Sequence, residues 1–223
     1  MSAPTPEPLR LVAVSAGLGQ PSATRLLVDR LTTATADRLT EQGAAPAVRV
    51  VELREHASDI ANAMVTGFPG SGLRSAVDVV TGADGLIAAT PVFTASYSGL
   101  FKSFVDVLED TAVAGKPVLL AATGGTMRHS LVLEHTMRPL FAYLRALTVP
   151  TGVFAASDDW GAGGDPYTAD LPRRIDRAAG ELAALMLDRP RPRGAEATAE
   201  AEDEDAVVPF EERLAAVRRP GGR

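Results

Sequence analysis

The chain has 223 residues, a formal net charge of −6 and a hydrophobic fraction of 46%. These values fit one globular domain with a substantial core and argue against a disordered protein. The absence of cysteine excludes disulfides, thiolate nucleophiles, zinc–thiolate sites and iron–sulfur clusters. With only three histidines we expect no metal site, and the negative charge argues against a nucleic-acid partner.

The N-terminal segment MSAPTPEPLR contains three prolines and no apolar core, so we expect no secretory signal. No stretch approaches the roughly 18 consecutive apolar residues that cross a bilayer. The sequence therefore predicts a cytoplasmic protein without a membrane partner.

Apolar runs of strand length alternate with helical patterns along most of the chain. The predicted strands are Leu9–Ser15, Ala47–Leu53, Gly85–Thr90, Pro117–Thr123 and Val149–Ala155. The predicted helices are Ser22–Gln42, Leu73–Thr81, Gly99–Glu109, Arg128–Leu147 and Thr168–Asp188. Strict alternation of this kind is typical of βαβ units. We therefore predict an α/β three-layer sandwich around a five-stranded parallel sheet.

The composition changes after residue 188, so we place the folded domain at residues 1–188 and a charged tail at residues 189–223. Arg189–Gly194 is a linker rich in proline and arginine. Glu196–Asp205 is strongly acidic, which is typical of disordered segments. Val207–Val217 has the pattern of a short amphipathic helix. We expect a partly disordered tail whose helix docks on its own domain or on a second subunit.

Ligands of an open parallel sheet bind beyond the carboxyl ends of the strands, where the strand order reverses. The first loop at such an end, Ser15–Arg25, leads into a helix N-terminus, whose free amides favour an anion. Ser15, Ser22 and Thr24 add hydroxyl groups. The alternative is an ordinary capped helix. The G-x-G-x-x-S sequence of this loop lacks the third glycine of the dinucleotide fingerprint.

The second loop, Thr90–Lys102, combines flat aromatic surface with hydroxyl groups. Phe93 and Tyr97 offer apolar faces, and Ser96 is one of several hydroxyls between and beside them. Such a mixture suits a planar heteroaromatic ring with a polar edge. The alternative is a turn with two aromatic side chains packed inward.

The third loop, Thr123–His129, contains two consecutive glycines. Glycine lets backbone amides approach a ligand closely, and with the Thr123 hydroxyl they suit the polar edge of a pyrimidine. The alternative is a simple turn. His129 is either a site residue or a surface one.

No nucleophile elbow, carboxylate pair or metal motif is present, so we predict no catalytic side chain and no metal ligand. A site rich in hydroxyls and amides is what hydride transfer through a flavin needs, because the cofactor carries the reaction and the protein orients it.

Three motifs carry a resemblance to a known family. They are S-x-G-x(4)-S-x-T in the first loop, T-P-V-F-x-A-S-Y-S-G-L-F-K in the second and A-T-x-G-T-x-R-H-S in the third. These look like the NAD(P)H-dependent FMN reductases, which have a flavodoxin-like fold. The similarity covers about Leu9–Gly161. It is strongest to the actinobacterial branch, often found beside flavin-dependent monooxygenases.

The resemblance implies an oxidoreductase that uses FMN and takes hydride from NAD(P)H. It implies that the FMN phosphate is held by Ser15, Ser22 and Thr24, with Ala23 between them. It implies that the isoalloxazine ring is lined by Pro91, Val92, Phe93 and Ser96, and that its pyrimidine edge is bound by Thr123, Gly124 and Gly125. A homodimer or homotetramer, and delivery of reduced flavin to a partner monooxygenase, are further implications.

Other interpretations stay open from the sequence alone. One is a same-fold enzyme with tightly bound FMN that reduces quinones, azo dyes or metal oxyanions. A flavodoxin-like electron carrier would usually be smaller and would lack the second loop. A nucleotide-binding module without catalysis fits the hydroxyl-rich loops but not the aromatic one. Arg25, Arg128 and Arg138 are the candidates for a contact with the 2′-phosphate of NADPH.

Overall fold

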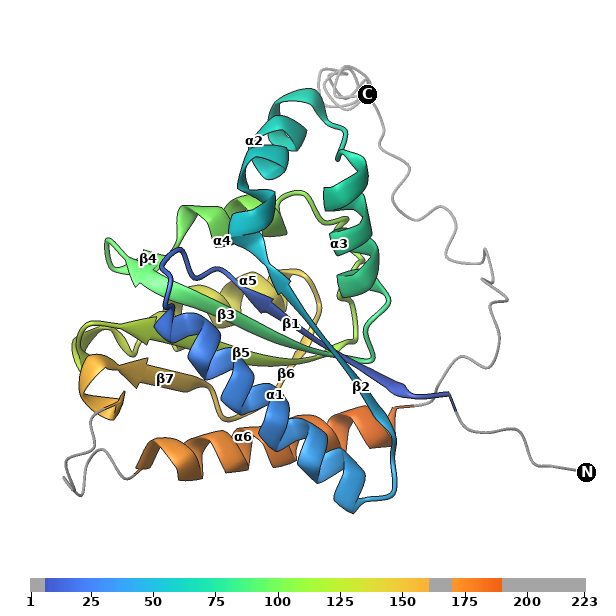
Figure 1. The fold of residues 1–223 in the computed structure, drawn as a ribbon, viewed down its shortest axis with the longest axis vertical. Coiled ribbons are helices and arrows are strands. Elements are labelled where there is room, and N and C mark those ends of the chain that lie inside the picture. Colours follow the sequence, from blue (N-terminus) through green and yellow to red (C-terminus); the bar gives the residue numbers. More distant parts are fainter. Residues whose placement is uncertain (1–6, 161–169, 190–223) are drawn as a thin grey trace, which may run out of the picture. The chain divides into compact units, whose positions relative to one another are not determined.

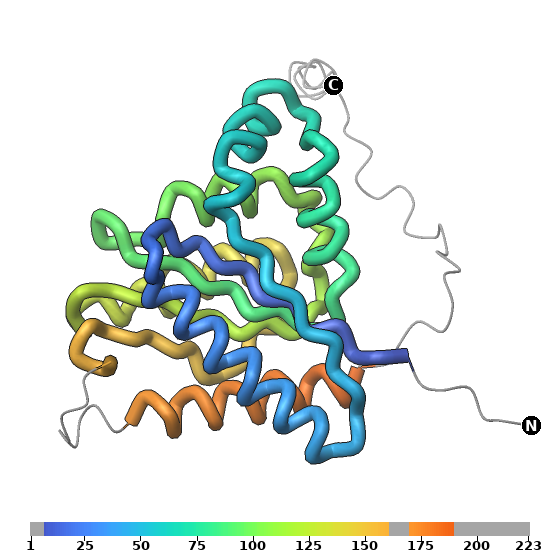
Figure 2. The backbone as a smooth tube through the Cα atoms, in the orientation of Figure 1, coloured from blue at the N-terminus to red at the C-terminus, as the bar shows by residue number. Residues whose placement is uncertain are grey.

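The computed structural model describes residues 7–160 and 170–189, which belong to one compact unit, Met1–Arg189. In this part of the chain seven strands form one sheet in the order β2-β1-β3-β5-β6, with β7 paired to β5 and β4 to β3 (Figures 1 and 2). The strands are β1 (Leu9–Ser15), β2 (Pro46–Glu52), β3 (Gly85–Phe93), β4 (Ser96–Tyr97), β5 (Pro117–Gly124), β6 (Leu147–Thr148) and β7 (Val153–Ala156). All pairs are parallel except the short β3–β4 hairpin.

Helices cover both faces of the sheet. They are α1 (Ala23–Glu41), α2 (Ala57–Thr66), α3 (Ser71–Thr81), α4 (Gly99–Val105), α5 (Arg138–Tyr143) and α6 (Asp170–Asp188). Single 3₁₀ turns span Leu53–His56, Met127–His129 and Ser157–Trp160.

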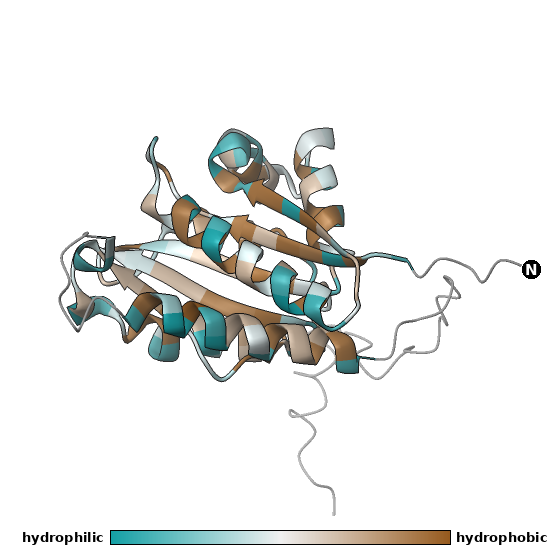
Figure 3. Ribbon diagram, turned by 60° about the horizontal axis from the view of Figure 1, so that its bottom comes forward, coloured by the Kyte–Doolittle hydropathy of each residue, from teal (hydrophilic) through white to brown (hydrophobic). Residues whose placement is uncertain are grey.

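Two hydrophobic cores flank the sheet because successive side chains of a strand point to opposite faces. On β1, Leu11 and Ala13 pack with α1 and α6, whereas Val12 and Val14 pack with α3, α4 and α5. Figure 3 shows this layering, with apolar strands between helices whose outer faces are polar. Strand order and layers confirm the predicted α/β sandwich and define a flavodoxin-like fold, with β6 and β7 sharing the outer position beside β5.

The predicted fifth strand, Val149–Ala155, was placed too early. β7 begins at Val153, and a separate β6 pairs with the start of β5. Pro150 and Gly152 lie between them, and proline cannot donate a ladder hydrogen bond. Together with the β4 hairpin, this division makes seven strands rather than five.

The predicted helix Arg128–Leu147 is wrong as a single helix. It divides into the 3₁₀ turn Met127–His129, a π-helical segment Leu133–Met137 and α5. Pro139 explains part of the division, because it has no N–H for the preceding turn and its ring clashes with the carbonyl four residues earlier.

Further differences concern helix lengths. The predicted helix Gly99–Glu109 ends at Val105, and α2 was not predicted. The first two residues of the last predicted helix, and all of the predicted tail except Arg189, lie outside the described residues. Within the described ranges, no helix combines the length and apolar character that crossing a membrane requires.

Candidate functional site

The register of the sheet brings the three loops to one edge. Ser15 lies opposite Ala89, and Pro91 lies opposite Thr123. Thr123 in turn lies opposite Ala155. Because these strands are parallel, the loops that follow their carboxyl ends gather beside the β1–β3 pair, where the strand order reverses. The sequence predicts this gathering correctly.

Ser15 ends β1 with its side chain fully buried. Like Leu11 and Ala13, it points to the face that α1 covers, because side chains alternate along the strand. Its Oγ has no hydrogen-bond partner in the described part of the chain. A buried hydroxyl without a partner costs about 1–3 kcal/mol, so this atom is suited to a ligand that accepts or donates a hydrogen bond.

The loop after β1 returns tightly onto the N-terminus of α1. A Cβ on Gly17 would lie 2.1 Å from Ser22 Oγ, so only glycine permits this approach. Ser22 is the N-cap of α1, and its Oγ accepts a hydrogen bond from the Arg25 amide at 3.2 Å. The amides of Ala23 and Thr24 belong to the first turn, which has no preceding carbonyls to bond. The local geometry is that of an anion site at a helix N-terminus.

A buried pair of hydroxyls joins the first loop to the third. Thr24 Oγ1 lies 2.7 Å from Thr123 Oγ1, and both side chains are buried. One hydroxyl donates to the other, so one proton of the pair remains available for a third group. Thr24 and Thr123 thus hold each other in place and retain one donor.

The second loop is a hairpin. Val92 pairs with Tyr97, and the turn residues Thr94 and Ala95 both have positive φ, at 49° and 64°. Thr90 Oγ1 accepts a hydrogen bond from the Ser98 amide at 3.0 Å, which ties the returning arm to β3. The hairpin leaves Phe93 45% exposed, beside the partly buried Pro91, Val92 and Ser96. Phe93, Pro91 and Val92 therefore form an accessible apolar surface. It lies close to the buried Thr123 hydroxyl, because Pro91 is opposite Thr123 in the sheet.

The two glycines of the third loop have different surroundings. A Cβ on Gly124 would lie 2.9 Å from Phe154 Cζ, so the packing of the protein itself demands glycine there. A Cβ on Gly125 would meet no atom of the described residues within 4 Å. The space beside Gly125 is open, as a close ligand would need.

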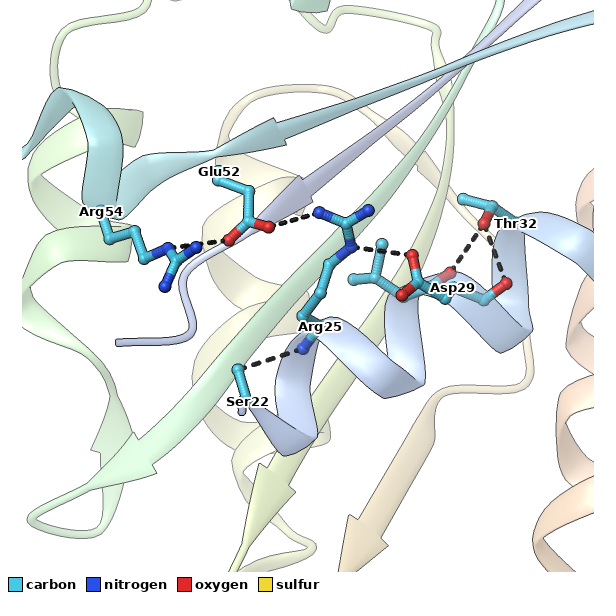
Figure 4. Close-up of polar contacts among 7 residues, drawn as sticks. Ser22, Arg25, Asp29, Thr32, Glu52 and Arg54 are labelled. Carbon is cyan, nitrogen blue, oxygen red and sulfur yellow. Dashed lines mark hydrogen bonds and ion pairs between the residues drawn. The ribbon is translucent and has the colours of Figure 1, made fainter. Parts of the chain in front are cut away.

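An ion-pair network lies beside the first loop (Figure 4). The Glu52 carboxylate pairs with Arg25 through Oε1 and lies 3.2 Å from Arg54 Nε through Oε2. Arg25 Nε also donates to Asp29 at 2.8 Å. Asp29 and Glu52 raise the pKa of Arg25, with the Asp29 hydrogen bond as the largest cause, while partial burial opposes them.

The network borders an open cleft of about 650 Å³, which Trp160 and the residues of the first loop also line. This network is not among the features that the sequence predicts. Glu52 was visible as the acidic residue that closes a predicted strand, but its pairing with two arginines depends on the fold.

The three arginines proposed for a 2′-phosphate have different surroundings. Arg25 is held by the network, and Arg138 pairs with Glu134 and donates to Thr148 Oγ1, near the amino end of β5. The guanidinium of Arg128 makes no ion pair or hydrogen bond within the described residues, and Arg128 is exposed in the third loop. His129 is exposed in the same turn.

The fold and this edge define a flavodoxin-like α/β protein with a site of the mononucleotide-binding type. Residues 9–161 match the family model of the NADPH-dependent FMN reductases. The chain belongs to this family, which confirms the predicted enzyme class together with FMN as the flavin and NAD(P)H as the hydride donor.

Individual relatives are similar over most of their length. The chain is 37% identical over 175 residues to an FMN reductase (NADPH) of Pseudomonas aeruginosa, covering 77% of this chain and 91% of that protein. It is 39% identical over 149 residues to the NADH-dependent FMN reductase SfnE of Pseudomonas putida, covering 67% and 77%. The solved structure of an oxidoreductase from Corynebacterium diphtheriae is 44% identical, with a TM-score of 0.79 over 82% of this chain and 99% of that one.

Proposed function

We propose that this chain binds FMN across the three loops and releases it reduced to a flavin-dependent monooxygenase. The phosphate would lie at the N-terminus of α1, held by Ser15, Ser22, Ala23 and Thr24. The ring would lie against Pro91, Val92, Phe93 and Ser96, with its pyrimidine edge at Thr123, Gly124 and Gly125. The observation that carries this placement is the fully buried Ser15 hydroxyl, which has no partner within the described residues and points to the side of α1.

When bound, FMN supplies the ring that takes hydride from the nicotinamide. The protein's part is to orient the two partners. The amides of the first turn of α1 and the Ser15 hydroxyl would fix the phosphate, and the free proton of the Thr24–Thr123 pair would fix a polar atom of the flavin. Phe93, which is 45% exposed, would provide apolar surface at the ring site.

We further propose a homodimer or homotetramer. The end of α2 and the loop after it expose three large apolar side chains, Met64 at 53%, Val65 at 88% and Phe68 at 77%. A cluster of exposed apolar residues of this kind favours association, and a second copy would cover it. Light scattering after gel filtration tests the proposal, with Val65→Ser and Phe68→Ser expected to lower the molar mass. A monomer in the wild type would overturn it.

The decisive experiment is anaerobic oxidation of NADPH and of NADH with and without added FMN. We expect oxidation that scales with added FMN and yields reduced flavin that a purified monooxygenase can use. Rapid reduction of a bound yellow cofactor, independent of added FMN, would overturn release. Absence of oxidation in a protein that binds FMN would overturn the catalytic assignment.

A further inference from the structure

Glu52 lies at the carboxyl end of β2, in register with Ser15 of the neighbouring strand. Only 12% of its side chain is exposed. Its two carboxylate oxygens are divided between two arginines that come from different elements, Arg25 in the first turn of α1 and Arg54 in the 3₁₀ turn after β2 (Figure 4). The carboxylate is largely buried; it accepts a hydrogen bond from Arg25 and forms an ion pair with Arg54, and these two contacts hold both guanidinium groups beside the end of β2.

Each arginine also makes a hydrogen bond to the segment between β1 and α1. With the Gln20 amide oriented to satisfy its hydrogen bonds, its oxygen accepts from Arg54 Nη1 and Nη2 at 2.5 and 2.6 Å. The backbone amide of Arg25 donates to Ser22 Oγ at 3.2 Å. Glu52 is thus connected to the middle of the loop through Arg54 and to its end through Arg25.

The charges of this network balance. Arg25 and Arg54 carry two positive charges, and Glu52 and Asp29 carry two negative ones, all within ion-pair distance of a partner. A neutral network adds little net attraction for an anion. Its contribution must therefore come from geometry rather than from charge.

We propose that Glu52 is a positioning residue, which holds the Ala16–Pro21 loop and the Ser22 cap in the shape that receives the flavin phosphate. The proposal rests on the proposed placement of FMN. Glu52 acts through Arg25, Arg54 and Gln20 and does not itself touch the flavin.

A positioning role and a purely electrostatic role of Glu52 predict opposite changes in FMN affinity for Glu52→Gln. Removing a negative charge near a phosphate strengthens phosphate binding if the electric field dominates. Loosening the loop weakens it if positioning dominates. Riboflavin lacks the phosphate, so its affinity reports on the rest of the site and is an internal control.

The experiment is a fluorescence-quenching titration of the full chain with FMN and with riboflavin. For Glu52→Gln we expect the Kd of FMN to rise about tenfold, as for the loss of one charge-assisted hydrogen bond, while the Kd of riboflavin stays within about twofold. Asp29→Asn is the matched comparison, because it removes the same charge from Arg25 without touching Arg54 or Gln20. Gln20→Ala, which leaves all charges in place, is expected to reproduce part of the effect on FMN.

The outcomes separate this inference from the proposed function. Wild-type affinities that are equal for FMN and riboflavin would overturn the phosphate site and, with it, the role of Glu52. A wild type that prefers FMN, combined with unchanged or tighter FMN binding in Glu52→Gln, would overturn only the positioning role. Equal losses for both flavins in Glu52→Gln would also overturn it, since they would report general damage, which thermal unfolding would reveal independently.

Discussion

The hydroxyls of Thr24 and Thr123 meet at 2.7 Å, although 99 residues separate them in the sequence. Thr24 lies in the first turn of α1 and Thr123 near the end of β5, and both are buried. This single bond fixes the helix N-terminus of the proposed phosphate site against the loop proposed for the pyrimidine edge. It adds a polar link to the apolar packing of α1 against β1, β3 and β5, which also holds the two halves of the site together.

Thr24→Val keeps the shape of the side chain but leaves the Thr123 hydroxyl buried without this partner. We expect the free energy of unfolding to fall by about 1–3 kcal/mol, because an unpaired buried hydroxyl pays its full desolvation cost. Urea denaturation of the flavin-free protein measures the change. The double variant Thr24→Val/Thr123→Val removes both polar groups and should recover part of the loss. Strict additivity of the two single variants would contradict the bond.

Ser15→Ala should change stability and flavin binding in opposite directions. The Ser15 hydroxyl is buried and has no partner in the described chain, so its removal should raise the unfolding free energy of the flavin-free protein by about 1 kcal/mol. The same substitution should weaken FMN binding about tenfold, by loss of one hydrogen bond to a charged phosphate. A titration with riboflavin should show little change. Loss of stability without flavin would show that Ser15 already has a partner.

The two glycines of the third loop offer a matched pair of alanine substitutions. The added Cβ of Gly125→Ala meets no atom of the described residues, so we expect unchanged stability without flavin but weaker binding of FMN and riboflavin alike. Gly124→Ala presses on the buried Phe154 ring and should cost about 1–3 kcal/mol of stability. Unimpaired flavin binding by Gly125→Ala would place the flavin away from this loop.

The sequence predicts the sheet well because its strands are long and apolar. β3 and β5 lie where nearly continuous apolar runs predict them, since strands covered on both faces need such runs. β1 and β2 also lie where they are predicted, although each run is interrupted by an arginine and β2 is an only partly buried edge strand. Helix α2 is not predicted from the sequence, because it buries only Ile60 and Ala63. Two buried residues do not produce a recognisable helical period in the hydrophobic pattern. The hairpin after β3 escaped because its turn residues are Thr94 and Ala95, where glycine or asparagine would have signalled a positive φ.

The candidate site could be predicted only in part. Loop chemistry and the order of the strands are local properties, so the gathering of the three loops at one edge follows from the sequence. Contacts between side chains distant in the sequence do not follow from it. The Thr24–Thr123 bond and the sharing of Glu52 by Arg25 and Arg54 depend on side-chain directions that only the folded chain fixes.

Of the three arginines predicted as candidates for the 2′-phosphate of NADPH, we expect Arg128 to be the one that contacts it. It is exposed in the third loop, and its guanidinium has no partner among the described residues, whereas Arg25 and Arg138 are held in ion pairs. Arg128→Ala should raise the KM for NADPH about tenfold and leave the KM for NADH nearly unchanged, because only NADPH carries the 2′-phosphate. Steady-state kinetics with both nucleotides test this. An equal rise for both would rule out a role in discrimination.

Lys116 precedes β5 at the opposite end of the sheet and is 3% exposed. Its Nζ donates to the carbonyl oxygens of Val80 and Thr81, both at 2.7 Å, at the end of α3. Burial lowers the pKa of Lys116 from its ordinary value of 10.5 to about 8; the positive charge of Arg189 acts in the same direction and Asp84 opposes it.

This shift makes stability depend on pH in a defined window. Between pH 8 and 10.5 the unfolded chain keeps a proton that folded Lys116 has lost, so the free energy of unfolding rises with pH, by at most about 3 kcal/mol. Below pH 8 both states are protonated and the contribution is constant. Lys116→Met should abolish the rise, whereas Lys102→Met, which removes the only other lysine of the chain, should retain it. Urea denaturation of the three proteins across this range measures the difference, and with ¹³C-labelled lysine the wild type should show one of its two side-chain signals titrating near pH 8. Two signals that both titrate above pH 10 would contradict the buried, shifted ammonium.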